Sequence, residues 1–169
     1  MNHMYIYMTT GTYSFLSKIK EKHPMESMFL MQNIDNALLL HESDQPSVFK
    51  TPRSFQVIES IGAFENKGIV IMNTIPVIEE ERPLLEYRFT HMKTLFENHS
   101  GFSAVRFLRT LKSDAYVILS LWKNDKSYID WEESTSYTTF KKEITTSSSP
   151  ANLLIGSAYV TKYFIPKDN

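Results

Sequence analysis

The chain has 169 residues, of which 42% are hydrophobic and 22% charged, as in an ordinary globular protein that forms one domain or two small ones. Its formal net charge is −1, so charge gives no reason to expect nucleic acid or a membrane surface as a partner. The chain contains no cysteine, which excludes disulfides, thiolate catalysis and cysteine-bound metals.

The N-terminal residues show no targeting pattern. Residues 1–6 lack a basic region followed by a long apolar core, so we expect no signal peptide. No run in the chain approaches the ~18 apolar residues that a membrane-spanning helix needs. We therefore expect a cytoplasmic protein that does not enter a membrane.

Residues 1–65 are predicted to form a β-α-β-β-α unit. Thr51 and Pro52 are typical of a helix N-cap and first helical position, and apolar residues follow until Gly62. This pattern predicts a helix across residues 52–61, with its apolar stripe at residues 55–61. The other predicted elements are strands at residues 5–8, 28–31 and 37–40, and a helix that carries Phe15, Leu16 and Ile19.

Residues 66–169 are predicted to form a β-α-β-β-α-β unit, which is the ferredoxin-like order. Three glutamates before Pro83 favour a helix start, because acidic groups complement the helix macrodipole. One long helix is expected across about residues 126–143, followed by a polar loop at residues 145–150. Strands are expected at residues 69–73, 102–108, 115–122 and 157–165, and the first helix is expected to bury Leu85, Phe89, Met92 and Phe96.

The most specific pattern is an apolar strand that ends in Trp122, followed by a helix that carries Trp131 in its first turns. Taken alone, a helical tryptophan is most often a core residue, and Asn73 at the end of its strand is most often a turn residue. Together, however, these residues resemble the antibiotic-biosynthesis-monooxygenase (ABM) superfamily. Within that superfamily the pattern is most similar to the Isd-type haem-degrading enzymes.

The resemblance implies that haem is the substrate and is opened by O2 with electrons from an external donor. It implies that Asn73 donates a hydrogen bond on the distal side of the haem, since a carboxamide donates without adding charge. It also implies that Trp131 presses on the porphyrin, whereas Trp122 is structural. Arg88 and Phe89 match an Arg-Phe pair of some members, in which the arginine pairs with a haem propionate; a solvated arginine is the alternative. The chain has five glycines and no phosphate-binding glycine loop, so no nucleotide cofactor is expected.

The sequence departs from this family on the proximal side of the haem. The iron-ligating histidine of the family lies ten residues after the tryptophan, where this chain has Lys141. No histidine follows His99, so the last helix cannot supply the usual ligand. Lys141 could ligate iron only as a neutral amine, which requires burial, and a solvated lysine is the alternative. His91 is the first candidate for a substitute ligand.

The likeness extends along the whole chain to the two-part HmoB-type and TRAP-type members of the superfamily. We therefore predict a haem-degrading monooxygenase with an altered proximal side. The alternative is a TRAP-like protein that keeps the fold and some haem binding, is catalytically weak or silent, and has a regulatory or stress-related role. Oxidation of a small quinol, known elsewhere in the superfamily, ranks last because no residue resembles a quinol base.

The predicted C-terminal sheet would have one face open. ABM domains close this face by dimerising into a barrel. In this chain the N-terminal unit could cover the open face instead. We therefore expect a monomeric pseudo-dimer rather than a homodimer.

Overall fold

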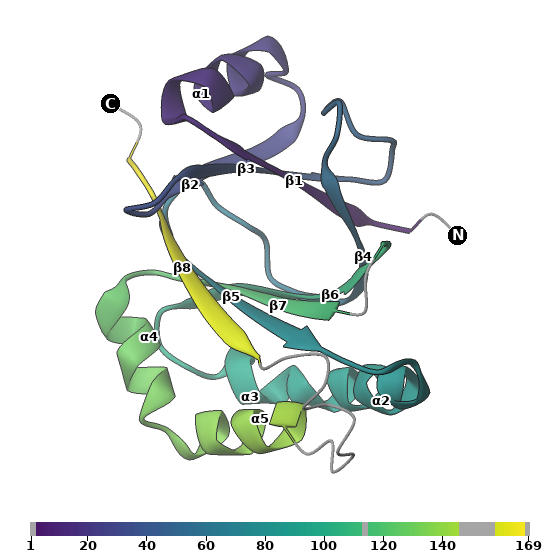
Figure 1. Cartoon of the computed structure of the whole chain (residues 1–169). Helices are drawn as coiled ribbons and strands as arrows, with labels where there is room; N and C mark the ends of the chain where they lie inside the picture. The colour runs from purple at the N-terminus through teal and green to yellow at the C-terminus, as the bar shows by residue number, and fades with distance from the viewer. Residues whose placement is uncertain (1–2, 113–114, 146–157, 168–169) are drawn as a thin grey trace.

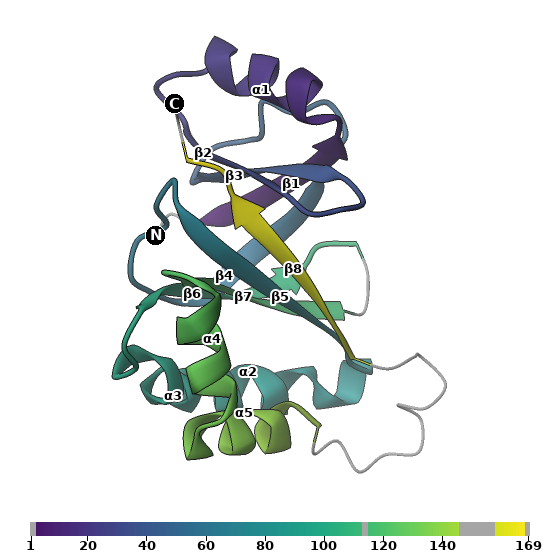
Figure 2. The same cartoon turned by 90° about the vertical axis from the view of Figure 1, so that its left-hand side faces the viewer.

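The computed structural model describes residues 3–112, 115–145 and 158–167. In this part of the chain, eight strands form a closed barrel (Figure 1). One helix covers one side of the barrel, and the remaining helices lie together on the opposite side (Figure 2). A closed barrel leaves no sheet edge with unpaired backbone groups.

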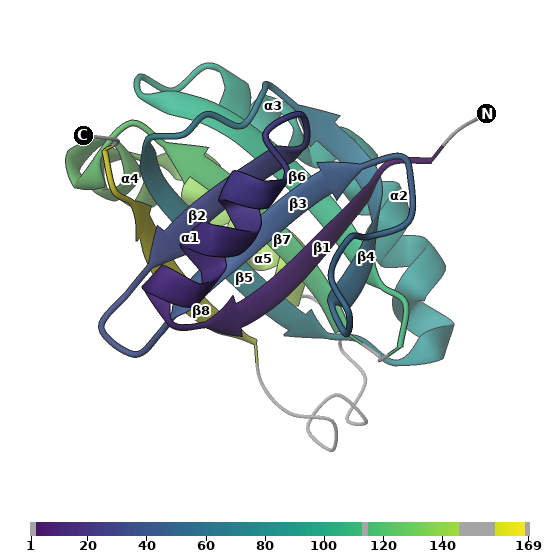
Figure 3. The same cartoon turned by 90° about the horizontal axis from the view of Figure 1, so that it is seen from above.

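The strands are β1 (Tyr5–Gly11), β2 (Ser27–Gln32), β3 (Ala37–Ser43), β4 (Arg53–Ile61), β5 (Gly68–Pro76), β6 (Phe102–Thr110), β7 (Ala115–Trp122) and β8 (Tyr159–Ile165). The helices are α1 (Tyr13–Lys22), the 3-10 turn η1 (Glu79–Glu81), α2 (Arg82–Met92), α3 (Thr94–Glu97), α4 (Asp125–Glu132) and α5 (Thr135–Thr145). Seen from above, α1 lies across β1, β2 and β3 (Figure 3).

The order around the barrel is β1-β3-β2-β8-β5-β7-β6-β4, and every neighbouring pair is antiparallel. The first four strands and the last four therefore meet at two joins, β4 with β6 and β2 with β8. The β2–β8 join has a single register pair, Gln32 with Phe164. Asn33 supports it by donating from Nδ2 to the carbonyl of Lys162 over 3.3 Å.

The predicted helix across residues 52–61 is wrong, because Arg53–Ile61 form strand β4. Phe55 and Val57 pack in the barrel interior, whereas Ile58 and Ile61 pack against the helices outside. A register shift between Val57 and Glu59 interrupts the strand alternation. A strand that is apolar on both faces and bulged in the middle has apolar residues at a spacing that imitates a helix. The N-terminal unit is therefore β-α-β-β-β.

The predicted single helix across residues 126–143 is also wrong, because it is divided into α4 and α5. Ser134 separates the two helices. Its Oγ donates to the Trp131 carbonyl over 2.5 Å and accepts from the Tyr137 backbone N–H over 3.2 Å. A serine that bonds in this way caps the following helix and competes with the preceding one. The predicted loop at residues 145–150 and the start of the last strand at Ser157 fall largely outside the described residues.

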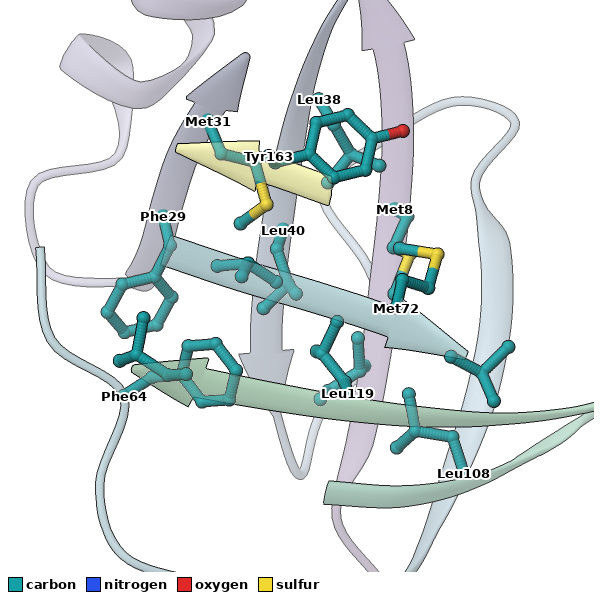
Figure 4. Close-up of a cluster of buried hydrophobic side chains, with 14 of the residues drawn as sticks. Met8, Phe29, Met31, Leu38, Leu40, Phe64, Met72, Leu108, Leu119 and Tyr163 are labelled. Atoms are coloured by element: carbon teal, nitrogen blue, oxygen red, sulfur yellow. The ribbon is translucent and has the colours of Figure 1, made fainter. Parts of the chain in front are cut away.

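Two hydrophobic clusters lie on the two sides of the C-terminal sheet. The first fills the barrel interior (Figure 4) and includes Met8, Phe29, Met31, Leu38, Leu40, Met72, Leu108, Leu119 and Tyr163. The second lies between the barrel and the helices α2–α5 and contains the expected stripe of Leu85, Phe89, Met92 and Phe96. Successive residues of β5 alternate between the two clusters, so this strand is apolar on both faces.

A buried ion pair connects the two halves of the chain inside the barrel. Nε of Arg106, on β6, lies 2.6 Å from a carboxylate oxygen of Glu42, on β3. The two side chains are only 7% and 17% exposed. Nη1 of Arg106 also donates to the Ile61 carbonyl over 3.0 Å, and the guanidinium lies 5.4 Å from the ring centre of Phe64. The arginine therefore contacts three separate segments of the chain.

We expect the substitution Arg106→Met to lower the free energy of unfolding by roughly 3 kcal/mol, because it leaves the Glu42 carboxylate buried without its partner. The unfolding midpoint in guanidinium chloride measures this loss. Lys126→Met is the matched control: it removes an exposed pair with Asp130, so the midpoint should not change measurably. Equal midpoints for the two variants would show that the buried pair does not hold the barrel together.

The chain closes the barrel without a second copy, so we still expect a monomer. Because both edges of the sheet are paired within the chain, a dimer would need a different surface. Light scattering should give a mass near 19.7 kDa. A tight dimer at twice this mass would contradict the expectation.

Candidate functional site

Asn73 is a buried polar residue on the helix-facing side of β5. It is 7% exposed, and its neighbours on the same face, Ile71 and Ile75, belong to the cluster beneath α2–α5. Its register partners are Ile118 on β7 and Val160 on β8. Among the described residues, none forms a hydrogen bond with its carboxamide. Its amide atoms are not among the fully buried atoms that lack a partner, so the carboxamide can still be reached and is a candidate contact for a ligand or a water molecule.

Trp131 lies in the centre of the helical layer. It is 1% exposed, and its indole Nε1 donates to the Leu95 carbonyl over 2.8 Å. Its ring stacks on Phe96 with ring centres 4.7 Å apart and lies 5.1 Å from Trp122. The structure therefore places Trp131 as a core residue that joins α4 to α3 and β7.

Phe89 and Arg88 are adjacent in α2 but lie in different surroundings. Phe89 is fully buried, with its ring centre 4.9 Å from that of Phe107. Arg88 points to the C-terminal part of α5: Nη1 donates to the Glu143 carbonyl over 3.1 Å, and Nε lies 3.5 Å from the Glu143 carboxylate. In this structure the guanidinium therefore ties α2 to α5.

Lys141 lies on the exposed side of α5, one residue after Phe140, which packs against Trp131. The structure therefore encloses Trp131 in the core and leaves Lys141 on the surface.

A cleft of 400 Å³ between α2 and α5 brings Arg88 and His91 together. Its walls include Leu84, Met92 and Glu143. The His91 ring is exposed on the outer side of α2 and meets the Tyr87 ring edge-on, with ring centres 4.9 Å apart. Arg88 and the candidate ligand His91 line this cleft, whereas Phe89 and Trp131 belong to the core beneath it.

The sequence reasoning missed a polar network beside the helical layer. The hydroxyl of Tyr116, which is fully buried on β7, donates to the carboxylate of Glu86 on α2. Arg109 lies 3.2 Å from the same carboxylate and donates to Gln56 on β4 over 2.7 Å. Burial, with the hydrogen bond to Glu86, raises the pKa of Tyr116, so this phenol stays protonated. The signal for this network is Arg109 itself, a charged residue in an apolar strand.

Two absences concern the described residues alone. Between residues 3 and 167, leaving out 113–114 and 146–157, no three histidine or acidic side chains gather as metal ligands. In the same residues, no helix combines the length and the apolar character needed to cross a membrane.

The comparisons with known sequences show the family. The family model described as "Antibiotic biosynthesis monooxygenase" matches residues 68–143, so this part of the chain is an ABM domain. The signal transduction protein TRAP of Staphylococcus epidermidis (strain RP62A) is 34% identical over 131 residues, which is 78% of each chain. TRAP of Staphylococcus aureus (strain MRSA252) is 30% identical over 132 residues, covering 78% of this chain and 79% of the relative. The chain belongs to the TRAP family of ABM-domain proteins.

Solved structures share the fold over nearly the whole chain. The structure of a major regulator of staphylococcal pathogenesis has a TM-score of 0.84 and 26% identity, covering 97% of this chain and 99% of that one. A haem-degrading enzyme from Listeria monocytogenes, LmHde, has a TM-score of 0.78 and 20% identity, covering 96% and 99%. At this identity the second likeness shows the fold alone. The expected ferredoxin-like ABM fold of mixed helices and strands is confirmed.

We expect Trp131→Phe to lower the free energy of unfolding by about 1–3 kcal/mol, because it removes one ring from the core and leaves the Leu95 carbonyl without its donor. Urea unfolding measures the change. Ile129→Ala, on the same helix but 47% exposed, is the control and should change stability much less. Unchanged stability in Trp131→Phe would show that the indole belongs to a ligand site rather than to the core.

Proposed function

We propose that this chain is a non-catalytic signalling protein of TRAP type, in which the ABM fold is a scaffold rather than a haem-degrading centre. The observation that carries the proposal is Lys141, an exposed cation at the place where the haem-degrading enzymes have their iron ligand. The relatives that share about a third of its residues are named signal transduction proteins, which supports this role.

Haem turnover requires an axial ligand that donates electron density to the iron. A lysine ammonium cannot do so. His91 is on another helix, α2, and lines a cleft in which the Arg88 guanidinium is already paired with the Glu143 carboxylate. Haem that reaches this protein would therefore be held mainly by apolar contact, with low affinity and little activation of O2.

The test is a haemin titration followed by ascorbate with catalase present. Wild type should bind weakly with a high-spin spectrum and show neither Soret decay nor iron release. Lys141→His should raise haem affinity by roughly tenfold or more, because a neutral imidazole is a good iron ligand. Lys142→His is the matched control, since it places the same side chain one residue further around α5. Haem breakdown by wild type would contradict the proposal.

Asn73 favours a second candidate, the haem-degrading monooxygenase. Its buried carboxamide has no hydrogen-bond partner among the described residues, as expected for a donor that waits for a ligand. In that case haem is the substrate and O2 and an external donor the co-reactants. Asn73 would supply the hydrogen bond on the distal side. Arg88 would contact a propionate after leaving Glu143, and His91 would be the candidate ligand.

This candidate has its own test. Asn73→Ala should leave haem affinity nearly unchanged and suppress turnover, because the lost donor acts in the transition state rather than on bound haem. His91→Ala should abolish any histidine-type spectrum, whereas His99→Ala, in the loop after α3, should not. If Asn73→Ala mainly unfolds the protein and activity per folded molecule stays the same, Asn73 is a core residue.

A further inference from the structure

A cavity of 320 Å³ lies at one mouth of the barrel, where β4 begins. Five strands contribute to it, and their registers place the lining residues in one continuous arc. Phe55 on β4 lies opposite Thr110 on β6. Thr74 on β5 lies opposite Val117 on β7 and Tyr159 on β8. The cavity is therefore built by the barrel itself rather than by a surface loop.

The inner wall of the cavity is apolar. Phe55 and Val117 are each 3% exposed and belong to the hydrophobic cluster inside the barrel. Leu108, the register partner of Val117, and Met72, next to Thr74 in β5, continue this cluster deeper into the barrel (Figure 4). The cavity therefore ends on a packed apolar floor and does not continue as a channel.

The rim of the cavity is cationic. Arg53 is the first residue of β4, and Lys112 follows the end of β6. The Leu111 N–H donates to the Ser54 carbonyl over 3.1 Å, which holds the segment with Lys112 beside the start of β4. Both cations are exposed, and neither forms an ion pair with another described residue. None of the described residues that line the cavity is acidic.

The two other arginines of these strands are neutralised. Arg106 pairs with Glu42, and Arg109 pairs with Glu86. Arg53 instead acts on the barrel interior: burial raises the pKa of Tyr163, and Arg53 opposes this shift. Asp35, in the β2–β3 hairpin, raises the pKa of Tyr163 further. Among the described residues, the mouth thus combines two cations that form no ion pair with an apolar floor.

We propose that this mouth of the barrel binds a small amphiphilic anion, with its head group at Arg53 and Lys112 and its apolar body on Phe55 and Val117. A guanidinium and an ammonium recognise a carboxylate or another oxyanion through charge-assisted hydrogen bonds. The volume suits a small ligand, and barrel mouths are common ligand sites. An inorganic anion alone would leave the apolar wall in contact with water. The inference is independent of the proposed signalling role and of the α2–α5 cleft.

The test is isothermal titration calorimetry of the full chain with octanoate, 1-octanol and inorganic phosphate as separate probes. Octanoate should bind. Octanol, which lacks the anionic head group, and phosphate, which lacks the apolar chain, should each bind at least roughly tenfold more weakly. Arg53→Gln and Lys112→Gln should each weaken octanoate binding by roughly tenfold. Lys22→Gln, which removes an exposed cation at the end of α1, is the control and should have no effect.

Ala115→Leu tests the apolar part of the cavity without changing either cation. Ala115 lines the cavity at the start of β7, so the larger side chain should fill it and abolish octanoate binding. Circular dichroism must show that Ala115→Leu is folded. If it is unfolded, octanoate binding by Arg53→Gln, a substitution at an exposed residue, tests the proposal instead. Octanoate binding that is unaffected by Arg53→Gln overturns the proposal, as does equal binding of octanol. Displacement of octanoate by haemin also overturns it, because both would then occupy one site.

Discussion

The constraint on which the structure depends is the pairing of both edges of its sheet within one chain. An open edge leaves backbone N–H and C=O groups without partners, and β4 and β8 remove both edges by bonding across the two halves of the barrel. The two joins are unequal. β4 and β6 pair along most of their length, whereas β2 and β8 share one register pair. The Arg106–Glu42 ion pair crosses the interior between the two halves, so the barrel does not rely on the narrow join alone.

Local signals in the sequence predicted the elements whose two faces differ. Helix α1 buries Leu16, which the spacing of apolar residues in the sequence predicted to lie on its apolar face. The sequence did not predict strand β4. One face of this strand lies in the barrel interior and the helices cover the other, so apolar and polar residues do not alternate along it. The break at Ser134 was also missed, since it depends on which carbonyl the hydroxyl meets in three dimensions.

The same limits apply to the candidate sites. Asn73 was predicted at the end of its strand, whereas β5 continues to Pro76, so Asn73 lies within the strand and not at its end. The surroundings of Trp131 depend on α3, which supplies the Leu95 carbonyl and the Phe96 ring. The barrel mouth was hidden for a more specific reason: Arg53 fell in a segment predicted as a helix, so nothing placed it beside Lys112.

The positions that match the haem-degrading enzymes differ in what they reveal about function. Trp131 is enclosed by aromatic rings and donates a hydrogen bond to the backbone, so the fold alone accounts for a tryptophan there. Its presence is therefore weak evidence for catalysis. Lys141 is exposed on α5, so burial does not dictate its side chain as it dictates that of Trp131. The identity of residue 141 is therefore the more informative of the two. Asn73 differs from both, because it is buried in its strand and none of the described residues forms a hydrogen bond with its carboxamide, so contacts among these residues do not explain an amide there.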